Sequence, residues 1–522
     1  MSFGTVYLVG AGPGDLGLVT LAAQRAIQSA DVILYDGLCN EAILQWAPPH
    51  CVLQCVGKRG HGGHWSQAQI DDLIVQHARE HRQVVRLKGG DTSVFARTTE
   101  EIERLEAEGI PYRIVPGLTV ALAASAYTGI PITHRDWSSS VALITAQLQS
   151  SDGHDDAEEP LDWSALACFP GTLIFYMGLR NAPVWSQQLI AHGKSPATPV
   201  ALIRRCSWSD QQVLRCDLAN VAETLSKHPE FRSPAIGIVG DVVRAASLRN
   251  WFTSQPLFGQ TWVVTSPSEQ AIKLEACIRS QGGEVLAAPA IEVVPPSDWA
   301  EVDALIARLR SIDWIVFSSQ AGVRSLMNRL LQLGYDARQL GNTSIAAVGQ
   351  ATAESLRTFG LGCDLLPEHG AGAEALRDRL MHAVAGRSVA LISHPDGRTL
   401  LEGSCREVAR EVVVVHAYAT HAAAAFSENV LELSRQCNQD RSRNVWWTAT
   451  SSNIAKHAVQ CLGEDAKALQ WISIAPAVTD TLHALGCQRV VTSPDASYAS
   501  MVQAVMEMVR DSEASAGSSQ ES

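Results

Sequence analysis

The sequence lacks several features that would assign it to common classes of protein. No apolar run approaches the ~20 residues that a membrane-spanning helix needs. Basic charge is not in excess, because 54 Asp and Glu outnumber 41 Lys and Arg and give a net charge of −13, which argues against binding nucleic acid through its phosphates. The first residues, MSFGTVYLVG, contain no basic region or cleavage site of a secretory signal. We therefore expect a cytoplasmic protein without membrane or nucleic-acid partners.

Paired metal-ligand cysteines are also missing. The twelve cysteines are scattered, and Cys51 and Cys55 do not form a CxxC pair. This pattern predicts reduced, mostly buried thiols and no metal site.

What the sequence does contain is an alternation of short apolar strands and helical patterns along 522 residues, with 46% hydrophobic and 18% charged residues. This alternation predicts an α/β protein with largely parallel sheets, and the length predicts more than one domain. The polar, acidic segment 150–160 is expected to be a flexible connection between two lobes. The expected divisions are a first domain over 1–251, a linker over 252–260, a second domain over 261–510 and a disordered tail over 511–522.

The second half contains an internal echo. DWIVFSSQAGVRSL is followed by SIAAVGQATAESLRTFG, and NVWWTATSSNIAKH is followed by WISIAPAVTDTLHALG. In each case a strand ends in hydroxyl residues, and a strand, turn and helix follow. The echo predicts two similar lobes that face each other across a cleft.

The stretch YLVGAGPGDLGLVTL, residues 7–21, places a glycine-rich turn between a strand and a helix. Such turns present backbone N–H groups to a ligand. Asp15 stands where a dinucleotide fingerprint has its third glycine, and Pro13 removes one N–H from the turn. A pyrophosphate is therefore the weaker alternative, and an adenosine ligand without phosphate, such as S-adenosylmethionine, is favoured.

Other motifs follow this turn in a fixed order: DVILYD (31–36), VGK (56–58), VVRLKGGDTSVFAR (84–97), VPGLT (115–119), YTGIPITHR (127–135) and IFYMG (174–178). Together they closely resemble the uroporphyrinogen-III C-methyltransferases of the tetrapyrrole methylase group, from about residue 3 to residue 250. The resemblance implies a two-lobed α/β domain that binds S-adenosylmethionine between its lobes and methylates C2 and C7 of uroporphyrinogen III, giving precorrin-2. The implied chemistry is attack of a pyrrole carbon on the sulfonium methyl, followed by loss of a proton, without a metal.

The resemblance also implies roles for individual residues. Asp36 matches the proposed proton acceptor and Lys58 the proposed donor. Arg97 and Arg135 are candidate partners of the substrate carboxylates. The implied cofactor contacts are Pro13, Gly89, Gly90, Asp91, Val94, Thr119, Val120 and Met177. Taken singly, an Asp at a strand end more often caps a helix or turn, a Lys is more often solvated and a Met more often lies in a core.

The chain departs from the family pattern GGDPxVFGRGGEE in the segment GGDTSVFARTTEE. Thr92 replaces a proline, and Ala96, Thr98 and Thr99 replace glycines that can permit a positive φ or a close approach of ligand. Cys206 replaces a glycine that contacts the cofactor. These changes put rate, regiospecificity and cofactor affinity in question.

Residues 259 to about 510 resemble uroporphyrinogen-III synthase in a series of weak motifs that occur in order, including DWIVFSSQAGVRSL (313–326), VALISHPDGRTLLE (389–402) and VVVVHAYAT (412–420). The resemblance implies that this half closes hydroxymethylbilane into uroporphyrinogen III with loss of water. That reaction needs a cleft that holds the chain in a ring-closing shape.

Tyr418 matches a family tyrosine placed to assist departure of the hydroxyl. Candidates that hold the acetate and propionate arms are Ser318, Ser319, Thr352, Arg398 and Thr448. Ordinary turn capping by the hydroxyls and packing by the tyrosine are the competing interpretations. Val478 followed by Thr479 departs from the family turn GPxTA, and it weakens the case for synthase activity.

The prediction is thus a bifunctional enzyme with S-adenosylmethionine as cofactor and tetrapyrroles as substrates, which forms a homodimer through its first domain. The alternative is a methylase for another precorrin or another target, joined to a half that binds a tetrapyrrole without converting it.

Overall fold

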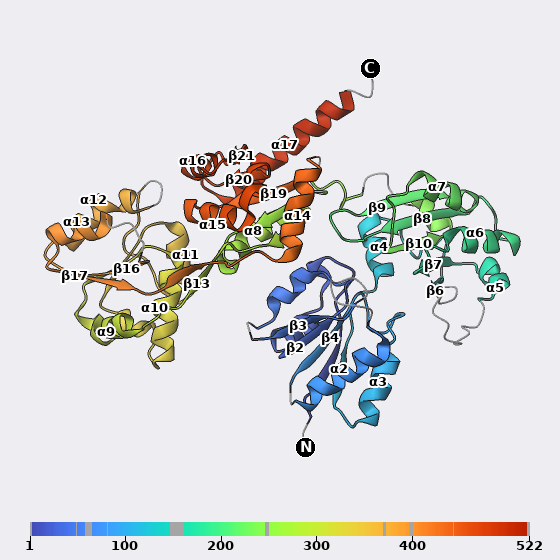
Figure 1. Ribbon diagram of the computed structural model, residues 1–522, viewed down its shortest axis with the longest axis horizontal. Helices are drawn as coiled ribbons and strands as arrows, with labels where there is room; N and C mark the ends of the chain where they lie inside the picture. Colours follow the sequence, from blue (N-terminus) through green and yellow to red (C-terminus); the bar gives the residue numbers. More distant parts are fainter. Residues whose placement is uncertain are drawn as a thin grey trace.

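The computed structural model describes residues 3–48, 50–57, 65–80, 82–146, 161–245, 250–368, 372–395, 400–441 and 443–518. The chain folds into four lobes, each with its own sheet (Figure 1). The expected connection over 150–160 lies outside the described residues.

The first lobe is a parallel five-stranded sheet in the order β3-β2-β4-β1-β5. Its strands are β1 (Val6–Gly10), β2 (Val32–Tyr35), β3 (Val52–Cys55), β4 (Val84–Lys88) and β5 (Tyr112–Val115). Its helices are η1 (Leu16–Leu18), α1 (Leu21–Gln28), η2 (Glu41–Trp46), α2 (Gln67–Arg79) and α3 (Thr98–Ala107). Apolar side chains on both faces of the sheet belong to two separate cores. Since all strands are parallel, their carboxyl ends meet at one edge.

The second lobe has a mixed sheet in the order β6-β7-β10-β8-β9. Its strands are β6 (Val141–Thr145), β7 (Thr172–Tyr176), β8 (Pro199–Arg204), β9 (Gln212–Asp217) and β10 (Ala235–Val239). Its helices are α4 (Val120–Thr128), α5 (Trp163–Cys168), α6 (Ala182–Ala191), η3 (Leu218–Asn220), α7 (Val221–Lys227) and η4 (Asp241–Ala245). Only β6 and β7 pair in parallel. The expectation of largely parallel sheets is wrong for this lobe, because β8 and β9 are joined by a short loop that allows only antiparallel pairing.

The join expected over 252–260 is packed on both sides. Phe252 lies against Tyr127 of the second lobe, with ring centroids 4.7 Å apart, and Leu257 is buried in a core with Trp262 of the third lobe. The two halves also touch elsewhere, since the Nδ2 of Asn429 donates to Glu41 at 2.9 Å.

The second half consists of two lobes with parallel sheets, in the orders β12-β11-β19-β20-β21 and β15-β14-β16-β17. The strands are β11 (Thr261–Val264), β12 (Glu284–Ala287), β14 (Trp314–Phe317), β15 (Ser344–Ala347), β16 (Ser388–Ser393), β17 (Glu411–His416), β19 (Val445–Ala449), β20 (Gln470–Ser473) and β21 (Arg489–Thr492). The chain crosses between these lobes through the antiparallel pair β13 (Ile291–Val294) and β18 (Ala419–Ala422).

The helices of this half are α8 (Ser268–Ser280), α9 (Ala300–Arg308), η5 (Leu309–Ser311), α10 (Gln320–Gln332), η6 (Ala337–Leu340), α11 (Gln350–Arg357), α12 (Ala373–Val384), α13 (Leu400–Val408), α14 (Glu428–Gln439), α15 (Ser452–Leu462), η7 (Gly463–Lys467), α16 (Pro476–Ala484) and α17 (Tyr498–Ser518). The two lobes predicted from the echo are present and share a local feature: Ser319 caps α10 after β14, and Ser451 caps α15 after β19 in the same way. Each cap accepts a backbone N–H three residues on, because a hydroxyl there satisfies an otherwise unpaired donor of the first turn.

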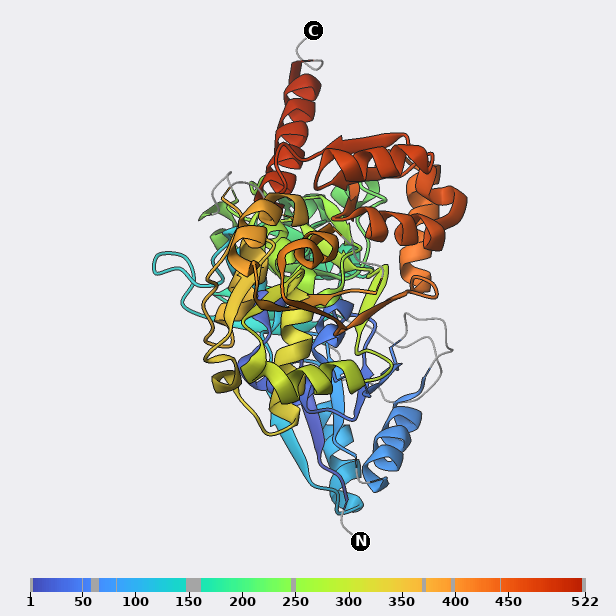
Figure 2. The same ribbon diagram turned by 90° about the vertical axis from the view of Figure 1, so that its left-hand side faces the viewer.

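The final helix differs from the prediction. The segment from Asp511 was expected to be disordered, but α17 continues to Ser518 and extends away from the body of the protein (Figure 2). Met501, Val502 and Val505 anchor the start of this helix in a core, and no proline follows to stop its propagation. Among the helices of the described ranges, none has the length and apolarity needed to cross a membrane.

Candidate active sites

Four glycines, Gly10, Gly12, Gly90 and Gly117, lie close together where β1, β4 and β5 end. Gly12 and Gly90 exchange backbone hydrogen bonds of 3.0 and 2.8 Å. A Cβ on Gly117 would lie 2.2 Å from the Gly90 oxygen, and one on Gly10 would lie 2.5 Å from the Gly117 nitrogen. Side chains are therefore excluded at Gly10 and Gly117 by backbone contact. Gly90 differs, because its φ is +75° and the space beside it is open, so bare main chain borders open space there.

The second lobe closes over the first turn. The carboxylate of Asp15 accepts from the hydroxyl of Tyr127 at 2.6 Å, and its backbone N–H donates to Ser207 at 3.1 Å. The indole of Trp208 donates to the carbonyl of Pro13 at 3.1 Å. Burial, followed by the bond to Asp15, raises the pKa of Tyr127 strongly, so its hydroxyl stays protonated as a donor. Asp15 thus joins the two lobes, which explains an acid at the position where a phosphate site has glycine.

The residues predicted to contact the cofactor come together between the two lobes. The carboxylate of Asp91 braces the turn by accepting from the N–H groups of Ser93 at 2.8 Å and Gly117 at 2.9 Å. Thr119 is the residue directly before α4. Its hydroxyl does not cap the helix but lies 2.7 Å from that of Tyr176. The remaining candidates at this crevice are Gly89, Val94, Val120 and Met177.

Two of these candidates come from opposite lobes. Val94 follows β4 in the first lobe but packs against the core of the second. Met177 directly follows β7, is half exposed and has a φ of +53°. The ring of Phe95 lies 5.1 Å from that of Tyr176, the neighbour of Met177. Their contact with a cofactor stays a prediction.

The departures from the family pattern do not strain the backbone as expected. The left-handed residues in this segment are Phe95 and Arg97, both with a φ of 52°, and not Ala96, Thr98 or Thr99. Thr98 and Thr99 begin α3, where threonine is compatible with the backbone.

The two remaining departures are buried. Thr92 accepts, through its carbonyl, a hydrogen bond from the hydroxyl of Thr98. Cys206 lies in the core between Arg205 and Ser207, which themselves take positive φ values. The expectation of a positive φ at Ala96, Thr98 or Thr99 is therefore wrong, and an effect of the substitutions on rate or cofactor affinity stays a prediction.

Restoring the family glycine at position 98 is expected to harm the protein. Thr98→Gly removes the buried hydroxyl bond and adds helix-start flexibility, for an expected loss of about 1–2 kcal/mol in the free energy of unfolding. Affinity for S-adenosylhomocysteine should stay within about two-fold, because no positive φ is relieved. Thr99→Gly, at an exposed neighbour, is the matched control and should cost less. Chemical unfolding and calorimetry measure both quantities, and a clear gain in affinity would contradict the account.

Asp36 stands at the carboxyl end of β2 with a partly exposed side chain. Its Oδ1 accepts from a terminal nitrogen of Arg86 at 2.6 Å, and its backbone N–H donates to the Leu87 carbonyl at 3.1 Å. Burial strongly raises the pKa of the neighbouring Cys39 thiol, which stays neutral. Lys58, the predicted proton donor, lies outside the described residues.

The two candidate substrate arginines of this half are both solvent-accessible. Arg97 precedes α3 and pairs with Glu100 at 2.9 Å. Arg135 lies in an exposed turn, with 90% of its side chain accessible. Both guanidinium groups reach solvent, as binding of a carboxylate-rich substrate requires.

In the second half, Tyr418 and Ser319 lie near each other at the crossover between lobes. Tyr418 is 8% exposed, and burial raises its pKa while the Ser319 hydroxyl partly offsets this effect. Ser319 caps α10, and Ser318 donates to the carbonyl of Ile392 at 2.8 Å. Ser319 therefore caps the helix, and its contact with substrate stays a prediction.

His394 was missed by the sequence reasoning. Its ring centroid lies 5.4 Å from that of Tyr418, and its Nε2 lies 2.9 Å from the hydroxyl of Thr420. The signal was available, because SHPD directly follows the apolar strand VALI. Arg398, four residues on, lies outside the described residues.

Two predicted substrate contacts of this half are buried. Thr352 is 5% exposed inside α11, and Thr448 is fully buried, with its hydroxyl accepting from the Thr265 N–H at 3.2 Å. The Thr448 hydroxyl is enclosed, so its assignment does not fit this conformation, and the substrate contact of Thr352 stays a prediction. Thr450 directly follows the strand that contains Thr448, and its hydroxyl lies 2.7 Å from that of Ser266.

Val478, the departure in the second turn, is a core residue. It is 5% exposed within α16 and packs in the core of that lobe. The hydroxyl of its neighbour Thr479 lies 2.5 Å from that of Ser473 and 2.6 Å from that of Thr492. A threonine hydroxyl is therefore present one position later, at Thr479, where it contacts other side-chain hydroxyls of the same lobe.

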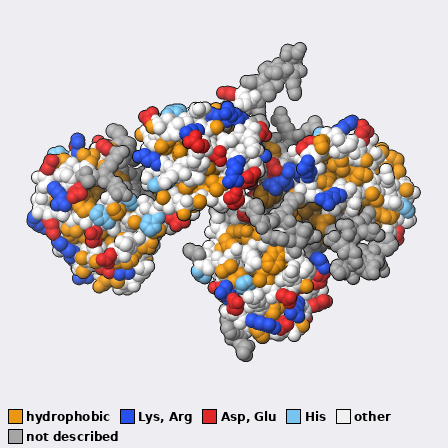
Figure 3. Space-filling view, viewed as in Figure 1, with side chains coloured by type: hydrophobic (Ala, Val, Ile, Leu, Met, Phe, Trp, Pro, Cys, Tyr) orange, Lys and Arg blue, Asp and Glu red, His pale blue; other side chains and the backbone are white. Residues whose placement is uncertain are grey.

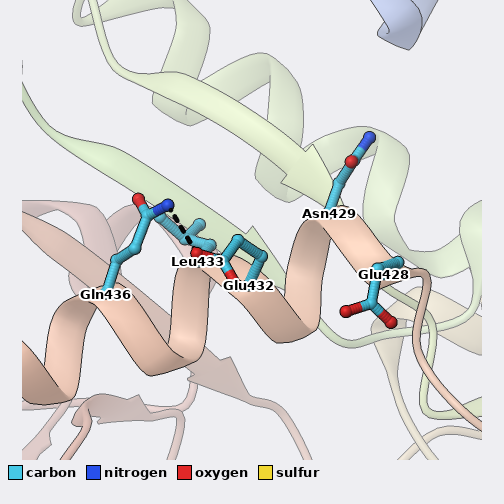
Figure 4. Close-up of a pocket in the computed structure, with 5 residues that line it drawn as sticks. All are labelled: Glu428, Asn429, Glu432, Leu433 and Gln436. Carbon is cyan, nitrogen blue, oxygen red and sulfur yellow. Dashed lines mark hydrogen bonds between the residues drawn. The ribbon is translucent and has the colours of Figure 1, made fainter. Parts of the chain in front are cut away.

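Two surface hollows lie away from these candidate residues. One follows α14 and is lined by Glu428, Asn429, Glu432, Leu433 and Gln436, with Glu432 bonded to Gln436 along the same helix (Figure 4). Its acidic lining would repel a carboxylate-rich substrate. Another lies on the second lobe beside β9 and α7. In the part of the chain that the structure describes, no cluster of His, Cys, Asp and Glu is arranged to hold a metal ion.

Comparison with known proteins assigns both halves. The family model of the tetrapyrrole (corrin/porphyrin) methylases matches residues 5–222, and that of uroporphyrinogen-III synthase HemD matches residues 272–503. The chain therefore belongs to the tetrapyrrole methylase family, and its second half is a uroporphyrinogen-III synthase domain. The resemblance predicted from the motifs is confirmed.

Individual proteins are similar to parts of this chain. The uroporphyrinogen-III C-methyltransferase of Bacillus subtilis is 38% identical over 356 residues, covering 68% of this chain and 71% of the relative. The S-adenosyl-L-methionine-dependent uroporphyrinogen III methyltransferase of Methanosarcina barkeri is 46% identical over 245 residues, covering 46% of this chain and 93% of the relative. The crystal structure of uroporphyrin III C-methyl transferase from Thermus thermophilus is 38% identical, covers 46% of this chain and 99% of its own, and has a TM-score of 0.40.

Proposed function

We propose that the chain is a bifunctional enzyme of tetrapyrrole biosynthesis. Its first half methylates uroporphyrinogen III at C2 and C7 with S-adenosylmethionine, and its second half makes uroporphyrinogen III from hydroxymethylbilane. The product of the second half is the substrate of the first, which gives the fusion a chemical reason. Family membership of both halves is the observation that supports this proposal most strongly.

We propose that S-adenosylmethionine binds where the first two lobes meet. Gly10 and Gly117 exclude side chains by backbone contact, and Gly90 leaves open space beside bare main chain. Asp91 keeps lone pairs for a ribose hydroxyl or an amino group beyond its two backbone bonds. The residues proposed to hold the cofactor are Pro13, Gly89, Gly90, Asp91, Val94, Thr119, Val120 and Met177. When bound, the cofactor supplies an electrophilic methyl group.

The remaining tasks fall to side chains of this chain. Arg97 and Arg135 are proposed to bind substrate carboxylates and so align the pyrrole carbon. Asp36 is proposed to accept the proton that the macrocycle loses after methylation, and Lys58 to donate one. Incubation with uroporphyrinogen III and methyl-labelled S-adenosylmethionine tests this proposal. Label in a dimethylated tetrapyrrole is expected, and label in another precorrin or target only would favour the alternative.

The synthase half is proposed to act through its interlobe surface. Tyr418 lies at the crossover beside the Ser319 cap, where its hydroxyl can assist departure of water from hydroxymethylbilane. Ser318, Ser319 and Arg398 remain the proposed partners of the acid side chains of the substrate.

Removal of one hydroxyl tests this role. Tyr418→Phe is expected to lower formation of the type III isomer by about 10-fold or more, because a positioned proton donor contributes at least that much. Stability should change little, since the buried ring is kept. Tyr335→Phe, at an exposed tyrosine of the same half, is the control. An unchanged ratio of isomer III to spontaneous isomer I would argue that Tyr418 is a packing residue.

The first half is further proposed to form a homodimer in the cytoplasm. Large hydrophobic side chains are exposed on its first lobe, and Figure 3 shows hydrophobic side chains gathered on the lobe that carries β2, β3 and β4. The exposed set includes Leu21, Leu38, Val52, Leu53 and Ile114. Exposed apolar groups of this kind support association between subunits. Light scattering on the purified chain would give its mass, and a monomer at micromolar concentration would contradict the proposal.

A further inference from the structure

Asp36 is joined to three buried charged side chains, Arg86, Lys88 and Glu101. Arg86 binds Asp36 at 2.6 Å through one terminal nitrogen and Glu101 at 3.2 Å through Nε. Lys88 binds the other oxygen of Glu101 at 2.6 Å. Glu101 is fully buried, Arg86 and Lys88 are about 5% exposed, and only Asp36 of the four reaches the surface, at 27%. The group holds two positive and two negative charges.

The location of this group is unusual for a parallel sheet. Arg86 and Lys88 lie on β4, which pairs with β1 and β2 on its two sides. Such strands are normally apolar on both faces. Replacing buried ion pairs by apolar side chains is often neutral or stabilising, so fold stability alone does not explain them. A role of Asp36, the one member with a partly exposed side chain, explains the group better.

The geometry fixes one oxygen of Asp36 and leaves the other for chemistry. The guanidinium of Arg86 also donates to the carbonyls of Leu34 at 3.4 Å and Leu87 at 3.1 Å, so it cannot swing. It holds Oδ1 of Asp36. Within the described ranges, Oδ2 of Asp36 makes no hydrogen bond.

Titratable groups from several elements of the first lobe surround the Asp36 carboxylate and its partners. The titratable groups that face it or its partners are Tyr35, Cys39, Glu41, Cys55, Asp71, Arg86, Lys88 and Glu101. Burial alone would lower the pKa of Arg86, but the carboxylates of Asp36 and Glu101 raise it. Burial lowers the pKa of Lys88, and Glu101 opposes this effect. Both cations therefore depend on Glu101 as a counter-ion.

We infer that Arg86 and Glu101 are positioning residues for Asp36 in the methylation reaction. Arg86 orients the carboxylate with Oδ2 toward the substrate. Glu101 shares the charge of Arg86, whose guanidinium binds both carboxylates. When Oδ2 takes the proton released by the macrocycle, the group changes from neutral to one positive charge, which Glu101 makes tolerable. The inference rests on the proposed role of Asp36.

Opposite shifts in pH dependence distinguish this role from a merely structural one. Arg86→Gln removes the cation that favours the ionised base, so the acidic limb of the kcat/KM profile should move up by about one pH unit. Glu101→Gln leaves two cations uncompensated, so that limb should move down by about one pH unit. Arg86→Lys keeps the charge and should keep the limb near that of the native chain, with a rate roughly 10-fold lower because its fork geometry is lost.

The control is Arg79→Gln, which breaks the exposed pair between Arg79 and Glu108 on the same lobe. Its pH profile of kcat/KM should superimpose on that of the native chain. Titration of the substrate carboxylates affects the profiles of all variants equally. Calorimetric affinity for S-adenosylhomocysteine should be unchanged in every variant, because the crevice glycines are untouched. If Glu101→Gln does not fold, the pair Lys88→Gln with Glu101→Gln removes one charge of each sign, so its limb should stay near that of the native chain while that of Arg86→Gln moves up.

The outcomes separate this inference from the proposed function. If the native chain transfers no methyl group to uroporphyrinogen III, the proposed function fails and the inference fails with it. If the native chain is active but the limbs of the variants coincide, or both move in the same direction, the inference is overturned and the proposed function stands.

Discussion

Asp36→Asn is expected to reduce methyl transfer to uroporphyrinogen III by about 10²- to 10⁴-fold, the usual contribution of a positioned proton acceptor. Asparagine keeps the size of the side chain and can still meet Arg86 through its carbonyl oxygen, but it cannot take a proton. The loss should fall mainly on kcat, because Asp36 lies at the end of β2 and not among the crowded glycines. Steady-state kinetics with labelled cofactor measure the effect.

Two further measurements make this expectation specific. Affinity for S-adenosylhomocysteine should stay within about two-fold of the native value, which shows that the crevice is intact. Asp72→Asn, at an exposed aspartate on α2 that pairs with Arg104, is the matched control and should retain full activity. A rate for Asp36→Asn within about three-fold of the native rate would show that Asp36 is only a turn residue.

Gly117→Ala is expected to abolish cofactor binding. The added Cβ would lie 2.2 Å from the Gly90 oxygen and 2.8 Å from the Gly10 Cα, and backbone on both sides cannot move away without opening the ends of β1 and β4. We expect affinity for S-adenosylhomocysteine to fall by more than about 100-fold. The free energy of unfolding should fall by about 3 kcal/mol, in the range of forced steric clashes.

The matched control for this substitution is Gly403→Ala. Gly403 lies within α13 and has open space where a Cβ would be added, so alanine should stabilise the helix by about 0.5–1 kcal/mol without changing cofactor binding. Calorimetry and chemical unfolding of both variants give the comparison. Native affinity in Gly117→Ala would mean that the crevice does not form the cofactor site.

The sequence predicted the parts of this fold that depend on local pattern. Alternating strands and helices predicted the α/β class, and the repeated strand-hydroxyl-helix pattern predicted two similar lobes in the second half. Local pattern did not predict the mixed sheet of the second lobe, because strand direction depends on long-range pairing. It also failed at α17, where residues of polar composition extend a helix that is anchored upstream.

Some features of the candidate sites could also be predicted from the sequence, and others could not. Glycine spacing predicted a main-chain crevice, and the structure gives the reason for Gly10 and Gly117 as direct backbone contact. Burial could not be predicted from the sequence: Thr448 carries a suitable hydroxyl but is fully buried. The group of Arg86, Lys88 and Glu101 was also missed, because ion pairs across a strand and a helix depend on packing that no spacing reveals.

The coupled reaction tests the central claim most directly. The full chain is incubated with hydroxymethylbilane and methyl-labelled S-adenosylmethionine, and the products are separated by isomer and by number of labelled methyl groups. The account predicts a type III product that carries label at C2 and C7, made by the two halves in succession. Formation of unlabelled isomer I alone would contradict it.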